Sequence, residues 1–257
     1  IFIHTNFKTL PSKIDLAIIS TNSDVRFKVT NELINKIKIK FIIFEKFLFQ
    51  QKSHYKFIIN KLKEKKIKSW VNCQRRAIPF YSYLKNKIKK NKSETKVYGN
   101  KWGLASNSIH YLDLFFYLFG KKRILRIEDN LKDKLYKSKR DGFYDFFGNF
   151  SLSFNDNSTM IFEDFNKKKK FVKIKVKLKN QTFDILEKSK TINLKYKNEN
   201  KYIFRTFKNY YLSEISTSII KQIILKKKSI LPSIEESSNY HLILLKIFLN
   251  HQQKIKK

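Results

Sequence analysis

Cysteine, glycine and proline are scarce in this sequence, which contains one cysteine, five glycines and three prolines among 257 residues. The single Cys73 excludes an internal disulfide and a zinc site built from several cysteines. A reducing compartment agrees with this cysteine usage, because disulfides persist mainly in oxidising ones. We therefore expect no metal site and a cytoplasmic location.

Long apolar runs are also absent. The richest stretch, residues 111–119, is shorter than the roughly 18 to 20 residues that a membrane helix needs, and it carries Asp113. The first residues lack the basic, apolar and small-residue succession of a signal peptide. With 42% hydrophobic residues and 24 Phe, the chain can still bury one large core or two modest ones. We expect a soluble protein without a membrane partner.

Acidic residues are few: 21 Asp and Glu accompany 56 Lys and Arg, and the formal net charge is +35. Such a charge suggests a polyanion partner such as nucleic acid. However, only 7 of the basic residues are arginines, the type that makes bidentate contacts to guanine and phosphate. The abundant Lys, Ile, Asn, Phe and Tyr share A/T-rich codons. We attribute the charge largely to genome composition and do not expect a nucleic-acid partner.

The first part of the chain alternates between strand and helix patterns. Apolar runs over 14–20, 40–46 and 70–75 are typical of buried parallel strands. Between them, apolar residues recur at helical spacing over 25–35 and 55–66. This order predicts a parallel α/β unit with right-handed crossovers.

The pattern changes beyond about residue 76. Strict alternation over 150–154, 159–162 and 172–178 predicts an antiparallel sheet with one solvated face. Helical patterns cover 109–119, 213–225 and 235–248. The fold class that we predict is α/β plus α+β, with an open, mainly antiparallel sheet and helices on one of its faces.

Polar residues follow two of the predicted parallel strands directly, as Thr21-Asn22 and Glu45-Lys46. Open α/β sheets bind ligands at the carboxyl ends of their parallel strands. A strand that simply emerges into solvent would explain the same residues, so both interpretations stay open.

A second cluster lies on the predicted helix. His110 and Asp113 are three residues apart and therefore on one helix face, where the carboxylate could fix the imidazole tautomer. A lone histidine on a helix is more often structural than catalytic. The two clusters together are more informative than either alone.

The order of these motifs resembles the glucose-fructose oxidoreductase and inositol dehydrogenase (Gfo/Idh/MocA) family. That family's second strand ends in Glu-Lys-Pro, and this sequence has Glu45-Lys46-Phe47 there. The family's later signature of Gly, Asp, His and Asp is matched by Gly103, Ser106, His110 and Asp113.

Two further parts of the sequence are similar to the same family. One is the Gln-Arg-Arg segment of 74–76 at the end of the third predicted strand, together with Pro79, and the other is the closing Leu-Pro-Ser-Ile-Glu-Glu of 231–236. The resemblance extends from about Asp15 to Phe248. It implies that residues 1–75 form the C-terminal part of a nucleotide-binding Rossmann domain. Residues 76–257 would form a substrate and oligomerisation domain, with the terminal helices packing back.

The resemblance implies hydride transfer between NAD or NADP and a hydroxyl of a sugar, sugar-nucleotide or cyclitol. Lys46 would hydrogen-bond the reacting hydroxyl, and His110 would accept its proton. Thr21 and Asn22 would line the nicotinamide ribose, with Glu45 beside them.

The substrate itself would contact Arg75, Ser106, Asn107 and His110. Arg75 or Arg76 would meet a carboxylate or phosphate, but an arginine after a strand is as often an ion-pair partner at the surface, so both roles stay open. This assignment requires Lys46 and His110 to converge on a single cleft. We also expect a homo-oligomer that forms through the antiparallel sheet.

Three departures from the family pattern stand out. No Gly-x-Gly-x-x-Gly turn precedes the first strand, and the chain begins with Ile, so we expect a chain cut short at its amino end that binds the dinucleotide poorly by itself. Ser106 replaces Asp, and Phe47 replaces Pro. Two alternatives stay open: a catalytically inactive oligomerisation module and a basic nucleic-acid binder.

Overall fold

The computed structural model describes residues 4, 6–88, 92–138, 140–198 and 201–255. Contacts between residues divide the chain into two units, and each is described by itself. The first unit comprises residues 1–73 and 216–245, and the second comprises residues 74–215 and 246–257.

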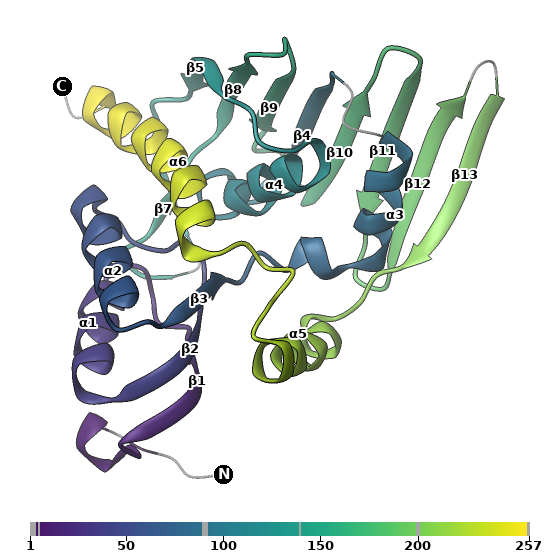
Figure 1. The fold of residues 1–257 in the computed structure, drawn as a ribbon. Coiled ribbons are helices and arrows are strands. Elements are labelled where there is room, and N and C mark those ends of the chain that lie inside the picture. Colours follow the sequence, from purple (N-terminus) through teal and green to yellow (C-terminus); the bar gives the residue numbers. More distant parts are fainter. Residues whose placement is uncertain (1–3, 5, 89–91, 139, 199–200, 256–257) are drawn as a thin grey trace. The chain divides into compact units, whose positions relative to one another are not determined.

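The first unit contains a three-stranded parallel sheet with the strand order β1-β2-β3 (Figure 1). Its elements up to residue 73 are η1 (Phe7–Thr9), β1 (Lys13–Ile19), α1 (Arg26–Lys36), β2 (Lys38–Phe44), α2 (Lys52–Glu64) and β3 (Lys68–Val71). The predicted alternation of parallel strands and helices is confirmed. The third strand is shorter than predicted and ends at Val71, because residues 74–77 turn into a 3-10 helix.

The uninterrupted apolar run of β2 follows from its central position in this sheet. Residues 41–44 are all buried, since a central parallel strand is covered on both faces. On α2, Tyr55, Ile58 and Leu62 are buried and recur at helical spacing. Beside β3, the Val71 N–H donates to Pro232 O at 3.0 Å, so the segment before α6 (Ile234–Ile255) adds a bond to this edge.

The second unit contains an eight-stranded sheet in the order β13-β12-β11-β10-β4-β9-β8-β5. Its strands are β4 (Glu94–Asn100), β5 (Ile124–Leu131), β8 (Gly148–Phe154), β9 (Thr159–Asp164), β10 (Phe171–Lys177), β11 (Gln181–Glu187), β12 (Thr191–Asn198) and β13 (Lys201–Lys208). Every neighbouring pair is antiparallel except β4 and β9, which are parallel. The sheet is therefore mainly antiparallel, as predicted.

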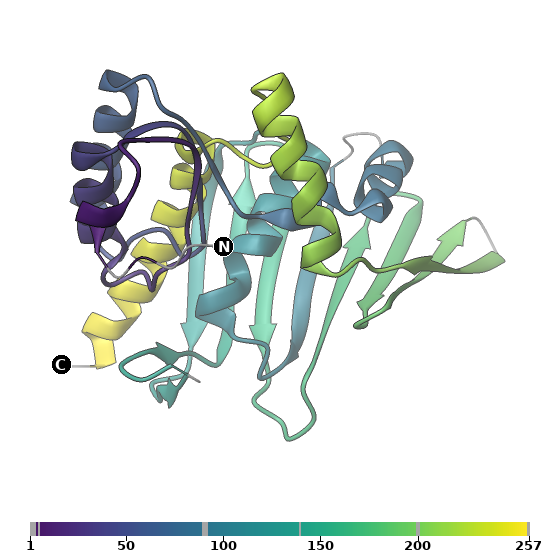
Figure 2. The ribbon, with the colours of Figure 1, turned by 90° about the horizontal axis from the view of Figure 1, so that it is seen from below.

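Helices lie over one face of this sheet (Figure 2). The remaining elements of the unit are η2 (Gln74–Ala77), α3 (Pro79–Ile88), α4 (Leu104–Phe119) and the short pair β6 (Tyr136–Lys137) and β7 (Tyr144–Asp145). On α4, Phe115 stacks on Phe154 of β8 with ring centroids 4.8 Å apart. On α3, Phe80 lies 4.9 Å from Phe207 of β13. Helix α5 (Leu212–Lys226), like α6, contributes residues to both units.

The opposite face of the sheet is solvated, which confirms the prediction from the alternating strands. On β10, Ile174 and Val176 are buried, whereas Lys173 and Lys177 are exposed. Lys177 forms an ion pair with Glu94 of the neighbouring β4 at 2.7 Å. Among the described helices, none has the length and apolar composition that crossing a membrane requires.

Candidate functional site

The carboxyl ends of β1 and β2 bring together the four predicted cofactor residues. Ile19 of β1 is in register with Phe44 of β2. Thr21-Asn22 and Glu45-Lys46 therefore follow neighbouring strands at the carboxyl end of the sheet, which we call the candidate cofactor edge. Asn72, which follows β3, donates a hydrogen bond to Glu45 Oε1. The Lys46 N–H donates to Glu45 Oε2 at 3.3 Å. The Glu45 carboxylate therefore joins the ends of two strands.

Arg26, the first residue of α1, lies behind this edge and was missed by the sequence analysis. Its side chain is 1% exposed. The guanidinium donates to four backbone carbonyl groups: those of Thr21, Glu45, Phe47 and Leu48. The signal in the sequence was an arginine two residues after the polar segment 21–24, in a chain whose basic residues are mostly lysines.

The Lys46–Phe47 peptide bond is cis, at the position where the family pattern has proline. The Phe47 ring lies edge-on to the buried His241 of α6, at a centroid distance of 4.7 Å. His241 Nδ1 lies 2.8 Å from Ser237 O. Burial and, to a smaller extent, the charges of Arg26 and Lys46 lower the pKa of His241 to about 3, although the hydrogen bond with Ser237 acts in the opposite direction. The imidazole is therefore neutral at physiological pH.

In the second unit, α4 begins at a left-handed glycine. Gly103 has φ 84°, and a Cβ there would lie 2.5 Å from Ser106 Oγ. The start of the helix is held by Asp145, which the sequence analysis missed: it accepts from Ala105 N–H at 2.6 Å and from Ser106 Oγ at 3.0 Å. Asn107 Nδ2 donates to Trp102 O at 2.6 Å. The predicted substrate residues Ser106 and Asn107 thus also fix the first turn of α4.

The Asp145 side chain is 3% exposed, and its burial and its hydrogen bonds shift its pKa in opposite directions. Burial raises the pKa of its carboxyl group, while the hydrogen bonds from Ala105, Phe146 and Ser106 act in the opposite direction. The net shift is upward. Ser106, which stands where the family pattern has Asp, therefore has a carboxylate beside it that comes from a distant part of the sequence.

His110 is half-buried one and a half turns into α4, and its Nδ1 is buried. We predicted that Asp113 shares its face, and the structure adds a partner that the spacing did not predict. Asp113 is fully buried and accepts from Arg76 Nε at 2.8 Å and from Arg76 Nη2 at 2.6 Å. The charge of the Asp113 carboxylate is therefore balanced by a guanidinium.

Arg75, the predicted contact for a substrate anion, is bound to Glu187 at the end of β11. Arg75 Nε and Nη2 donate to the two carboxylate oxygens at 3.1 and 2.8 Å. The guanidinium also lies 4.2 Å from the centre of the Tyr111 ring. Burial alone would raise the pKa of Glu187, but the Arg75 charge and the hydrogen bonds from Arg75 and Tyr81 lower it. Arg75 is thus paired with a carboxylate of its own unit.

The predicted site residues fall into two groups. Thr21, Asn22, Glu45 and Lys46 belong to the first unit, whereas Arg75, Ser106, Asn107 and His110 belong to the second. The convergence of Lys46 and His110 on one cleft stays a prediction. Within the described ranges, no three His, Cys, Asp or Glu side chains gather into a group that could hold a metal ion.

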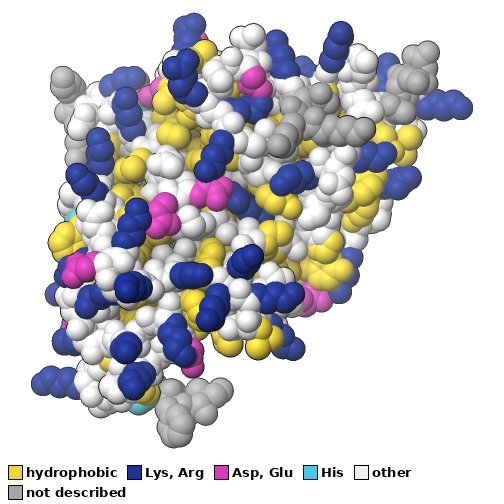
Figure 3. Space-filling model, viewed as in Figure 1, with side chains coloured by type: hydrophobic (Ala, Val, Ile, Leu, Met, Phe, Trp, Pro, Cys, Tyr) yellow, Lys and Arg dark blue, Asp and Glu magenta, His cyan; other side chains and the backbone are white. Residues whose placement is uncertain are grey.

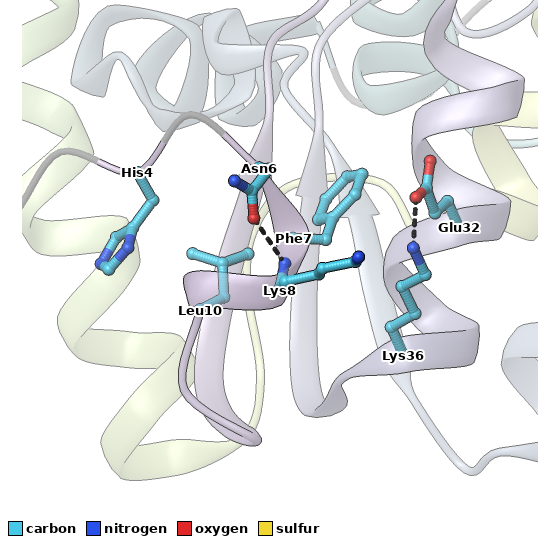
Figure 4. Close-up of a pocket in the computed structure, with 7 residues that line it drawn as sticks. All are labelled: His4, Asn6, Phe7, Lys8, Leu10, Glu32 and Lys36. Carbon is cyan, nitrogen blue, oxygen red and sulfur yellow. Dashed lines mark hydrogen bonds and ion pairs between the residues drawn. The ribbon is translucent and has the colours of Figure 1, made fainter.

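A hollow of about 660 Å³ lies at the other end of the parallel sheet (Figure 4). It is lined by His4, Asn6, Phe7, Lys8, Leu10, Glu32 and Lys36. Residues 6–10 precede β1 and Lys36 precedes β2, so the hollow is at the amino ends of the strands. Its ion pair, Lys36 with Glu32 at 2.6 Å, joins successive turns of α1. This hollow is therefore separate from the candidate cofactor edge.

Basic side chains do not single out another site on the face drawn in Figure 3. There, the Lys and Arg side chains of the described residues are spread among apolar and other polar ones. Elsewhere among the described residues, several lysines and arginines are paired with acids, as Lys96 is with Glu163 at 2.6 Å.

No family model and no curated protein matches this sequence. Solved structures do match it. UDP-N-acetylglucosamine 3-dehydrogenase GnnA from Acidithiobacillus ferrooxidans has a TM-score of 0.72 at 10% identity, over 95% of this chain and 81% of that one. The transcriptional regulator Gal80p from Kluyveromyces lactis has a TM-score of 0.72 at 14% identity, over 94% and 76%. The dehydrogenase MviM from Clostridium difficile has a TM-score of 0.65 at 13% identity, over 92% and 79%.

The chain has the fold of these proteins. At 10 to 14% identity the likeness shows the fold alone, and that fold is the one implied by the motif resemblance to the Gfo/Idh/MocA family. The neighbours include both dehydrogenases and a regulator of transcription, so the function has to be argued from the residues.

Proposed function

We propose that this chain belongs to an NAD(P)-dependent oxidoreductase that transfers hydride to or from a hydroxyl-bearing carbon of a sugar, sugar-nucleotide or cyclitol. The observation that carries the proposal is the carboxyl-end edge of the parallel sheet, where Glu45 and Lys46 follow the buried residues 41–44 of β2. There Glu45 is bonded to Asn72 after β3 and, through the Arg26 guanidinium, to Thr21 after β1. Ligands bind at such edges in open α/β sheets. The fold shared with two dehydrogenases adds support.

The residues present fit one end of a nicotinamide dinucleotide. Thr21 Oγ1 is buried and has no hydrogen-bond partner among the described residues, so its hydroxyl is available to a ligand at the cofactor edge. Asn22 beside it is exposed and offers an amide. The printed sequence contains no Gly-x-Gly-x-x-Gly turn for the pyrophosphate. The fit is therefore to the nicotinamide and its ribose, and not to the phosphates.

When bound, the nicotinamide ring would supply the hydride acceptor or donor. Lys46 would donate a hydrogen bond to the reacting hydroxyl and stabilise negative charge as it develops on that oxygen. His110 would accept the hydroxyl proton as a general base. Ser106 and Asn107, one turn before His110 on α4, would orient neighbouring substrate hydroxyls.

Variants of Lys46 and His110 test the assignment in the full product of the gene that encodes this sequence. Lys46→Ala and His110→Ala should each lower kcat by about 10²-fold or more, since each would remove a group that acts on the reacting hydroxyl. Lys56→Ala on α2 and His4→Ala serve as matched controls, because both side chains are exposed and neither belongs to the proposed site. Unchanged turnover in both site variants would remove the catalytic assignment.

Cofactor binding by this polypeptide alone gives a second test. Because the sequence lacks the glycine-rich turn, we expect isothermal titration with NADH or NADPH to show weak binding or none. Tight binding would contradict the idea that the pyrophosphate needs donors that these residues do not provide.

A further inference from the structure

The buried position of Arg26 is energetically unfavourable for a charged side chain. Its side chain is 1% exposed, and burial of a cation is unfavourable unless it is well hydrogen-bonded. Arg26 also stands at the first position of α1, where the helix dipole disfavours positive charge. A local capping role does not explain it, because the bonds of the guanidinium go to carbonyls outside the helix.

The acceptors of Arg26 surround Lys46. Nη1 donates to Glu45 O at 2.7 Å and to the carbonyl of Phe47, the residues on either side of Lys46. The same nitrogen lies 3.2 Å from Leu48 O, and Nη2 donates to Thr21 O after β1. One planar guanidinium thus fixes the peptide groups on both sides of Lys46 and ties them to the neighbouring strand end.

Two other elements hold the rest of this turn. Asn72 binds the Glu45 side chain from the end of β3. Tyr55 of α2 donates from its hydroxyl to Phe49 O at 2.7 Å and accepts from Phe49 N–H at 3.3 Å. The backbone from Glu45 to Phe49 is therefore held from three sides, and Arg26 supplies the bonds to the carbonyls that flank Lys46.

We propose that Arg26 is a positioning residue, which sets the place of the Lys46 ammonium by clamping the backbone on both sides of it. The proposal rests on the function proposed for Lys46. A planar fork with several fixed donors suits this task, whereas a lysine would offer a single ammonium and would not span the four carbonyls. Arg26→Lys therefore keeps the positive charge and removes the planar arrangement of donors.

Hydrogen exchange followed by mass spectrometry tests the clamp without any turnover. We compare wild type, Arg26→Lys, Arg26→Gln and the control Lys28→Gln, an exposed residue of the same helix. Exchange of the 45–49 amides should rise about tenfold or more in both Arg26 variants, while amides of the buried β2 core change much less. An unchanged 45–49 segment, or a rise of equal size in β2, would overturn the proposal.

A measurement on the wild-type chain covers the case in which the variants do not fold. The Arg26 guanidinium protons should exchange slowly with solvent in NMR spectra, since their described acceptors are buried or half-buried carbonyl groups. Rapid exchange of these protons would overturn the clamp.

A double-mutant cycle on kcat separates positioning from a general structural effect. If Arg26 acts through Lys46, Arg26→Lys should lower kcat about tenfold in wild type and have little further effect in the Lys46→Ala background. Additive losses would overturn the proposal. If Lys46→Ala itself leaves turnover unchanged, the proposed function fails, and the exchange experiment alone then decides whether Arg26 clamps the turn.

Discussion

The buried His241 should make the stability of this protein fall as the solution becomes mildly acidic. Its pKa is about 3 in the folded chain and 6.5 in an unfolded one. The folded value is the lower one, so the unfolded chain binds the proton first. The free energy of unfolding then decreases as the pH falls below about 6.5 and stops decreasing, for this group, near pH 3.

The size of the effect follows from the two pKa values. Between pH 7 and pH 5 this one group should remove about 2 kcal/mol from the free energy of unfolding. Urea titrations at pH 7, 6 and 5, followed by circular dichroism, measure the loss in wild type and in His241→Gln. The variant keeps an amide for hydrogen bonding but cannot titrate, so its decrease should be smaller than that of wild type by about 2 kcal/mol.

The exposed His4 provides the matched control, because His4→Gln also removes one imidazole. The control should follow wild type at all three pH values. Parallel pH dependence of wild type and His241→Gln would refute the reasoning, since it would mean that the buried imidazole does not resist protonation in the folded state.

Two further predictions concern the second unit. Asp113→Asn should lower the free energy of unfolding by about 3 to 5 kcal/mol in urea titrations, because it leaves the buried Arg76 without its carboxylate; the double change Arg76→Met with Asp113→Leu should cost less. Gly99→Ala should cost about 1 to 3 kcal/mol in the same assay, because its Cβ would lie 2.0 Å from the carbonyl oxygen of Phe171 on β10. A Gly99→Ala protein as stable as wild type would show that β4 and β10 separate easily.

The elements with the strongest periodicity were predictable from sequence, and those defined by their neighbours were not. β2 and β10 were found because an unbroken apolar run and a strict alternation each have one common structural explanation. β4 was missed: its Glu94–Asn100 segment carries Gly99 and mixed polarity, and it is a strand because β9 and β10 pair with it on either side. The α3 helix, which follows a 3-10 turn, was missed as well.

The candidate site was predictable where it depends on strand ends and not where it depends on partners distant in sequence. The positions of Glu45 and Lys46 followed from the end of an apolar run. The pairing of Arg75 with Glu187 did not, because the two residues are 112 positions apart and the spacing of charges carries no information about sheet order. For the same reason, no local pattern could assign Asp113 to Arg76.

Two of the three departures from the family pattern, Phe47 and Ser106, have one structural feature in common. Phe47 stands where proline would restrict the backbone, and there the Arg26 guanidinium binds the carbonyls around Lys46. Ser106 stands where a carboxylate would lie, and there Asp145 reaches the same turn of α4 from a distant strand. In both cases a buried side chain from elsewhere in the unit supplies the constraint or charge that the motif residue would have supplied locally. A substituted residue in a motif is therefore weak evidence that a site has been lost, until the residues that contact that position from distant parts of the sequence are known.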